Sequence, residues 1–148
     1  MGMQGINRVV IPVDRSEEAR LAVDQGSTLA SLLGIDVAII SIDDSIQYIA
    51  SAALEKKLRS EHEVVLNQFR KAVEGKNVNV VTEIIVGDQP AQEIIKYVNE
   101  NDLIVMVTHA RKGMDRFILG SVSEEVLHFV NCPVMIFKPT TKKIEAVI

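Results

Sequence analysis

Hydrophobic residues along the chain fall into short continuous runs that alternate with longer segments of helical spacing. Each continuous run is bounded by polar or turn-forming residues, which is typical of a strand buried on both faces of a parallel sheet. Five such runs predict strands at Arg8–Val13, Val37–Ile42, Val78–Val86, Leu103–Val107 and Val134–Phe137. The four segments between them carry apolar residues three or four positions apart and predict amphipathic helices.

Capping residues indicate where the predicted helices begin and end. Ser16 is expected to cap the first helix, and Gly34 to end it with a left-handed residue. Pro90 suits the first turn of the third helix, and Gly120-Ser121 opens the fourth, with Ser121 a favourable N-cap. The predicted inward faces include Leu54, Leu58, Val65 and Phe69 of the second helix and Val122, Val126 and Leu127 of the fourth.

Strands that alternate with helices in this way predict an α/β fold, a single doubly wound parallel sheet of five strands with helices on both faces. The 148 residues are enough for one domain of this kind, so we expect one domain over residues 1–148. Such a sheet binds its ligand beyond the carboxyl ends of its strands, where the winding direction reverses. The candidate site therefore consists of the segments directly after the strands: Asp14, Ile42–Asp44, Gly87-Asp88 and the chain from Thr108 onward.

Composition and charge narrow the class of protein. Hydrophobic residues make up 47% of the chain, and the net charge of -4 offers no overall attraction to nucleic acid or to an anionic membrane. The single cysteine, Cys132, cannot form an internal disulfide and fits a reducing compartment. The N-terminus lacks a signal-peptide pattern, and no apolar run approaches the roughly 18 residues that span a bilayer. We therefore expect a soluble, cytoplasmic protein with neither a nucleic-acid nor a membrane partner.

Two features carry candidate ligand chemistry. Gly120-Ser121-Val122 lies at a helix start, where unpaired backbone amides and the helix dipole attract an anion such as a phosphate. The preceding loop carries cations, Arg111 among them, that can fold over the same anion, although helix starts of this kind also occur without any ligand. Asp14 can accept hydrogen bonds from ribose hydroxyls or an adenine amino group, or it can simply begin a turn beside Ser16.

The sequence favours binding over turnover. The motifs GxxxxGK(S/T) and GxGxxG, which hold nucleotides in many enzymes, are absent. His62, His109 and His128 lie far apart and show no metal-ligand spacing, so no metal site is assigned to them. No pair of residues suggests a nucleophile with its base, and we expect no catalytic residue and at most slow hydrolysis of any bound nucleotide.

The chain resembles the universal stress protein family at motifs spread along its whole length. They are VVIPVD followed by SEEA, then VGDQPAQEII, DLIVMVTHARKGMDRFILGSVSEEVL and CPVMIF, in this order. The resemblance implies a UspA-like domain of the adenine nucleotide alpha hydrolase type, with strand order 3-2-1-4-5. It also implies a homodimer paired through Val134–Phe137, which acts in stress response as a sensor or regulator with an unknown protein partner.

Members of the family that bind ATP or AMP carry the motif G-x2-G-x9-G-(S/T), and this chain retains only the end of it. The first two glycines correspond to Val107 and Ala110, whereas Gly120-Ser121 is intact. A branched side chain at Val107 is expected to narrow the ribose site. Arg111 offers a positive charge that offsets a lost backbone amide, because guanidinium and phosphate pair well.

The resemblance implies two functions, and the replaced glycines leave both open. In the first, the chain binds ATP or AMP, and Mg2+ or Mn2+ is held only through the nucleotide phosphates. In the second, it is a dimeric interaction module whose pocket is occluded and binds no nucleotide. The implied contacts are adenine at Val13 and Ile42, ribose at Asp14 and Val107, and phosphates at Ala110, Gly120, Ser121 and Val122, aided by Arg111.

Overall fold

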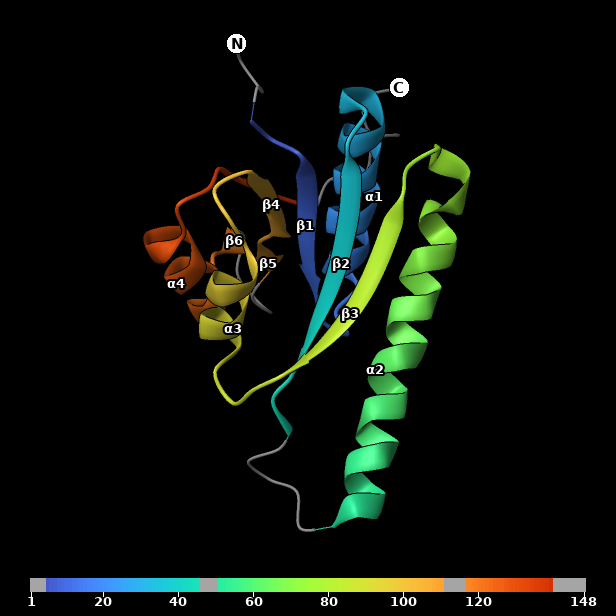
Figure 1. Cartoon of the computed structure of the whole chain (residues 1–148). Helices are drawn as coiled ribbons and strands as arrows, with labels where there is room; N and C mark the ends of the chain where they lie inside the picture. Colours follow the sequence, from blue (N-terminus) through green and yellow to red (C-terminus); the bar gives the residue numbers. More distant parts are fainter. Residues whose placement is uncertain (1–4, 46–50, 111–116, 140–148) are drawn as a thin grey trace.

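The computed structural model describes residues 5–45, 51–110 and 117–139 and is built around one five-stranded sheet (Figure 1). Its strands are β1 (Arg8–Val13), β2 (Asp36–Asp43), β3 (Val80–Val86), β4 (Asp102–Val107) and β7 (Val134–Phe137). They lie in the order β3-β2-β1-β4-β7, and every neighbouring pair is parallel. Because β7 is the fifth of the predicted strands, this order confirms the expected 3-2-1-4-5 arrangement.

In the described part of the chain, two helices cover each face of the sheet. α1 (Glu18–Leu33) and α2 (Ala52–Val73), which is followed by a 3-10 turn at Glu74–Lys76, lie over one face. α3 (Pro90–Tyr97) and α4 (Ser121–Phe129) lie over the other face and pack against each other (Figure 1). Helices on both faces of a parallel sheet confirm the doubly wound α/β fold.

The central strand β1 directs its side chains into two separate cores. Val9 and Ile11 belong to the core beneath α1 and α2, whereas Val10 belongs to the core beneath α3 and α4. All three are wholly buried. Burial on both faces explains why this strand has a continuous apolar run rather than alternating apolar and polar positions.

A short antiparallel hairpin follows β4. It consists of β5 (His109–Ala110) and β6 (Phe117–Ile118), in a register that pairs His109 with Ile118. The sequence pattern predicted a loop over the whole of Thr108–Leu119, and the hairpin corrects that expectation. Strands of two residues are too short to show an alternating pattern.

The ends of the helices match the sequence-based prediction at Gly34 and differ from it at Ser16 and Ser121. Gly34 ends α1 in the left-handed conformation, with φ of 69°, as predicted. Ser16 does not cap α1, because the helix begins at Glu18 and the Ser16 hydroxyl donates instead to the carboxylate of Asp14. Ser121 is likewise not a cap but the first residue of α4, and Gly120 occupies the N-cap position.

Among the side chains predicted to face inward, Leu54, Val122 and Leu127 are exposed. Leu54 lies in the first turn of α2, which extends past the carboxyl ends of the strands (Figure 1). α4 is short and lies at one side of the sheet, and Val126 is its one buried residue. A helical stripe therefore predicts the inward direction correctly only where the sheet lies beneath it.

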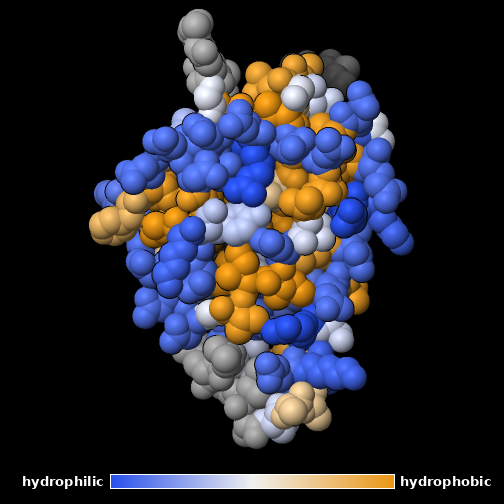
Figure 2. All heavy atoms as spheres, viewed as in Figure 1, coloured by the Kyte–Doolittle hydropathy of each residue, from blue (hydrophilic) through white to orange (hydrophobic). Residues whose placement is uncertain are grey.

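The α3–α4 layer leaves the outer part of the sheet uncovered at β3. Figure 2 shows apolar side chains gathered on this face, over β2 and β3. Val81 of β3 is exposed on this face, which it shares with Ile85 of the core beneath α3 and α4. β3 forms one edge of the sheet, and β7 forms the opposite edge.

Close packing of α1 on the sheet depends on Gly26. A Cβ atom at this position would lie 2.8 Å from Cδ1 of Ile11 and 3.4 Å from Cβ of Val105. We expect Gly26→Val to lower the free energy of unfolding by about 1 to 3 kcal/mol, because the added side chain overpacks a filled core. Urea denaturation followed by circular dichroism measures this change.

Gly75→Ala is the matched control, because a Cβ atom at Gly75 meets nothing within 4 Å. This variant should unfold at nearly the same urea concentration as the unmodified protein. Equal stability of the two glycine variants would show that α1 does not require a glycine at position 26.

Candidate functional site

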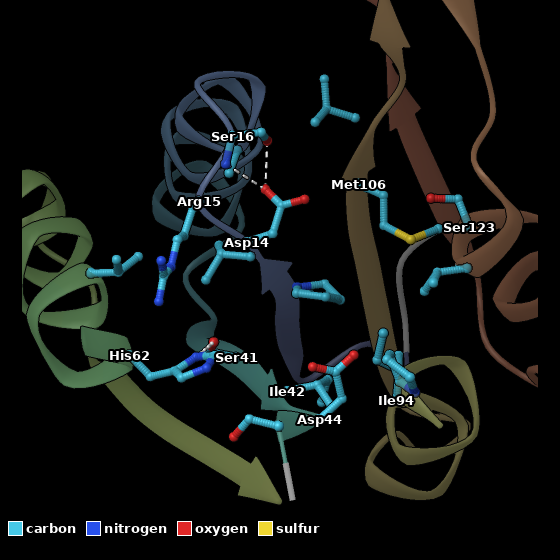
Figure 3. A pocket seen from close by; sticks show the side chains of 18 of the residues that line it. Asp14, Arg15, Ser16, Ser41, Ile42, Asp44, His62, Ile94, Met106 and Ser123 are labelled. Carbon is cyan, nitrogen blue, oxygen red and sulfur yellow. Dashed lines mark hydrogen bonds between the residues drawn. The ribbon is translucent and has the colours of Figure 1, made fainter. Parts of the chain in front are cut away.

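A cavity of about 500 Å³ opens at the carboxyl ends of the central strands (Figure 3). It lies where β1 pairs with β2 on one side and with β4 on the other, which is the point where the winding direction of the sheet reverses. The volume is in the range of small-molecule sites. The described residues that line it are Pro12, Val13, Asp14, Arg15, Ser16, Ala19, Ser41, Ile42, Asp44, Ser45, Leu58, His62, Val65, Pro90, Ile94, Met106, Val107, Val122 and Ser123.

The structure brings most, but not all, of the predicted contact residues to this cavity. Its lining includes Val13, Asp14, Ile42, Val107 and Val122. Gly120 and Ser121 lie immediately before Val122 at the start of α4 but are not part of the lining, and Ala110 lies in β5. Arg111 lies outside the described residues.

Asp14 follows β1 and is held in a tight turn. Its Oδ1 accepts a hydrogen bond from the backbone amide of Ser16 at 2.8 Å and another from the Ser16 hydroxyl (Figure 3). This is the turn that the sequence left as an alternative to ligand binding. The turn also fixes the carboxylate at the cavity, so the two roles are compatible.

Val107 contributes to the cavity wall while packing mainly into the core. Its exposed fraction is 7%, and it belongs to the apolar cluster beneath α1 and α2 together with Val13 and Val105. The cavity keeps its volume of about 500 Å³ with this side chain in place. The branched side chain therefore shapes the wall without filling the space beside it.

The first turn of α4 faces the cavity through Val122 and Ser123. Gly120 at the N-cap has φ of -71° and ψ of 165°, and among the described residues no side-chain hydrogen bond caps the helix there. The first amides of a helix have no partner within the helix and attract anions together with the helix dipole. An anionic group in the cavity can thus take the position of the missing cap.

The opposite wall contains a polar pair that sequence reasoning missed. The Ser41 Oγ atom on β2 lies 2.7 Å from Nδ1 of His62 on α2 (Figure 3). A serine hydroxyl beside a histidine nitrogen is a contact that the sequence did not predict. The two residues are 21 positions apart, on different elements, and only the fold brings them together.

A signal for His62 was nevertheless present in the sequence. It falls between Leu58 and Val65, at helical spacing within the stripe predicted to face inward. A polar side chain in such a stripe indicates a partner on the facing strand.

Asp43 completes the polar group on this wall. Its Oδ1 lies 3.8 Å from Nε2 of His62, and the carboxylate accepts hydrogen bonds from the backbone amide and the hydroxyl of Ser45. Burial acts to raise the pKa of Asp43, but the Ser45 hydrogen bonds, His62 and Arg59 outweigh it and hold the pKa below its usual range. The carboxylate, 2% exposed, is therefore ionised at neutral pH.

An ion pair joins the β1–α1 turn to α2 beside the cavity. The guanidinium of Arg15 contacts the carboxylate of Glu61, and both side chains are well exposed. Exposed pairs of this kind contribute little to stability because solvent screens them. Their position matters more, since Arg15 also lines the cavity.

The described residues contain neither a candidate metal site nor a candidate membrane-spanning helix. Within residues 5–45, 51–110 and 117–139, no group of three or more His, Cys, Asp or Glu side chains has a geometry that could hold a metal ion. No helix in these same ranges is long and apolar enough to cross a bilayer.

Comparisons with known proteins extend over almost the whole chain. The model of the universal stress protein family matches residues 5–138. The universal stress protein MJ0531 of Methanocaldococcus jannaschii is 30% identical over 144 residues, which cover 92% of this chain and 84% of that protein.

Solved structures show the same fold. The structure of protein MJ0577 of Methanocaldococcus jannaschii superposes with a TM-score of 0.75 at 27% identity, covering 92% of this chain and 98% of that one. The universal stress protein from Archaeoglobus fulgidus in complex with dAMP superposes with a TM-score of 0.66 at 18% identity, covering 88% of this chain and 96% of that one.

Asp43→Asn removes the charge of the buried carboxylate while keeping its shape. We expect the free energy of unfolding to fall by about 1 kcal/mol at pH 7, because the favourable effects of Ser45, His62 and Arg59 on the charged form are lost. A lowered folded-state pKa stabilises the protein above the ordinary carboxyl pKa of about 4, and this stabilisation disappears as the pH falls through the lowered value.

Urea denaturation of both proteins at pH 7 and at about pH 3 measures this pH dependence. The difference between them should shrink on acidification, because the carboxyl group of the unfolded unmodified protein then becomes protonated and the stabilisation from its charged form decreases. A difference that stays constant, or grows, would contradict the role assigned to the charge of Asp43.

Proposed function

The chain belongs to the universal stress protein family, and we propose on that basis that it binds an adenine nucleotide, ATP or AMP, in the cavity beside β1. The nucleotide changes the surface that the protein offers to a partner protein, so the chain acts as a sensor or regulator in stress response. Mg2+ or Mn2+ joins the site only through the nucleotide phosphates. Hydrolysis of ATP is at most slow.

The observation that carries this proposal is the cavity itself. Its apolar walls at Val13 and Ile42 suit a purine ring, and Asp14 offers a carboxylate to ribose hydroxyls. The uncapped first turn of α4 suits the phosphates. A protein of the same fold binds dAMP, which supports the same class of ligand here.

The replaced glycines favour a second function, a dimeric interaction module that binds no nucleotide. Val107 and Ala110 stand where nucleotide-binding members of the family have glycine. The volume that remains beside Val107 weighs against this alternative.

Release of bound nucleotide separates the two functions. The purified protein is denatured with acid, and any released nucleotide is identified by mass spectrometry. The stripped protein is then titrated calorimetrically with ATP and with AMP. Nucleotide that is released, or that binds saturably, supports the nucleotide-sensing function. If no nucleotide is released and none binds, that function is overturned in favour of the interaction module.

Gly120→Asp tests the position of the phosphates. A Cβ atom at Gly120 meets nothing within 4 Å and the backbone φ of -71° suits any residue, so the variant should fold normally. We expect its affinity for AMP to fall at least about tenfold, because a carboxylate then faces the phosphate at the start of α4. Calorimetric titration measures the affinity.

The same substitution at Gly75 is the control, since a Cβ atom there also meets open space and the residue lies far from the cavity lining. Gly75→Asp should bind AMP as the unmodified protein does. Unchanged affinity for AMP in Gly120→Asp would show that the phosphates do not bind at the start of α4.

We also propose a homodimer formed through β7, the strand at one edge of the sheet. The carbonyl groups of Pro133 and Phe137 accept hydrogen bonds from β4, so the intervening residues Val134 and Ile136 direct their backbone groups toward the open edge. An open strand edge is a template for pairing with a second chain. Met135, between them, is exposed.

Met135→Glu places two like charges close together across a paired β7 edge. We expect this variant to sediment as a monomer and the unmodified protein as a dimer in analytical ultracentrifugation. Val81→Glu, at an exposed position of the opposite edge strand β3, is the control and should remain a dimer. Loss of the dimer in Val81→Glu but not in Met135→Glu would show that the interface is formed by β3 and not by β7.

A further inference from the structure

The wall that α2 contributes to the cavity contains a connected polar group. Ser41 and Asp43 occupy alternate positions of β2 and therefore point to the same face of the sheet, toward α2. His62 reaches from α2 between them, with Nδ1 2.7 Å from Ser41 Oγ and Nε2 3.8 Å from Asp43 Oδ1. Ser41 and His62 both line the cavity (Figure 3).

The order serine, histidine, aspartate resembles a hydrolase triad, but the geometry differs from one. A triad carboxylate holds its histidine by a hydrogen bond, and the separation of 3.8 Å between Nε2 and Oδ1 is too long for one. The same Oδ1 accepts from Ser45 instead. Ser41 lies within a strand and is only 4% exposed, rather than at the sharp turn that presents a nucleophile.

When His62 is neutral, the hydrogen bond between Ser41 and His62 has a defined direction. A neutral histidine carries one ring proton, and the ionised Asp43 carboxylate beside Nε2 favours placing it on that nitrogen. Nδ1 is then an acceptor, so the only hydrogen of the Ser41 hydroxyl must point at it. In this state the Ser41 hydroxyl presents only hydrogen-bond acceptors to the cavity, and no hydrogen-bond donor.

Protonation of His62 reverses the direction of the hydrogen bond. Both ring nitrogens of an imidazolium are donors, so Nδ1 now donates to Ser41 Oγ. The hydroxyl hydrogen of Ser41 is released and can point into the cavity. A purine ring nitrogen, which has a lone pair and no hydrogen, is a suitable acceptor for it.

We propose that the Ser41–His62 pair recognises the purine base, and that protonation of His62 turns Ser41 from an acceptor into a donor toward a ring nitrogen of that base. The inference rests on the proposed nucleotide site and assigns a specificity-determining role to one wall of it. Carboxylates of Asp14 and Asp44 also line the cavity, so hydrogen-bond acceptors are already present there and an added donor changes which ligands fit.

The charged groups around His62 come from three segments. Asp43 and Asp44 lie at the end of β2, Arg59 and Glu61 lie on α2 itself, and Arg15 and Asp14 lie in the β1–α1 turn, with Arg15 paired to Glu61. Carboxylate and guanidinium side chains ordinarily keep their charge between about pH 5.5 and 8, whereas histidine changes its charge in this interval.

Calorimetric titration with adenosine across about pH 5.5 to 8 tests the inference. Adenosine has no phosphate, so the ligand's own phosphate titration does not enter. We expect affinity to be about three- to tenfold higher at the acidic end, the gain of one hydrogen bond. His62→Gln and Ser41→Ala should each bind adenosine with nearly the same affinity at both ends of the range.

His128→Gln is the matched control, because His128 is exposed on α4 and is not part of the cavity lining. It should keep the pH dependence of the unmodified protein. Analogues in which one ring nitrogen is replaced by C–H identify the accepting atom. Among 1-deaza-, 3-deaza- and 7-deazaadenosine, one should lose the gain in affinity at low pH.

The outcomes separate this inference from the nucleotide site on which it rests. Adenosine binding that does not depend on pH, or a pH dependence that persists in His62→Gln, overturns the role of the pair and leaves the site intact. A gain at low pH that all three analogues retain also overturns it. Absence of binding by adenosine, AMP and ATP at every pH overturns both proposals.

Discussion

The parallel pairing of β1 with β2 on one side and β4 on the other is the constraint on which the cavity depends. Parallel strands end at the same edge of the sheet, and the chain leaves β1 and β2 toward one face and β3 and β4 toward the other. The segments after β1 and β4 therefore diverge, and the space between them is the cavity. Its position follows from the strand order before any particular side chain is considered.

The opposite end of the same strands is closed by a polar anchor. Arg8 at the start of β1 makes two hydrogen bonds to the carboxylate of Asp102 at the start of β4, at 3.0 and 2.8 Å. The guanidinium also lies 4.8 Å from the centre of the Tyr97 ring. Asp102 is almost fully buried, so removing its partner would leave an uncompensated charge. The strand pair is thus held firmly at its amino end, while the carboxyl end remains open to a ligand.

Strands and helices that follow a repeating pattern can be predicted from the sequence, whereas contacts between residues far apart in the chain cannot. Apolar runs located all five strands of the main sheet, because strands buried on both faces have few polar positions. Ser16 was misassigned because a nearby carboxylate, Asp14, competes for its hydroxyl group. The contact between Ser41 and His62 joins a strand of the sheet to a helix that covers it, and no local pattern specifies which strand residue a helical residue meets. The direction of Val107 was equally a property of the packed core.

The two ends of the cavity differ in how they respond to protons. At α4 the groups that face a ligand are backbone amides, which do not titrate, and the helix dipole is fixed by the fold. At α2 the wall consists of a hydroxyl whose direction depends on a histidine. The protein groups that face the phosphates of a bound nucleotide would therefore be unchanged near neutral pH, while the contact to its base would change. On the protein's side, acidity would then act on the recognition of the base and not on the phosphate anchor, because the two interactions lie on different elements of the fold.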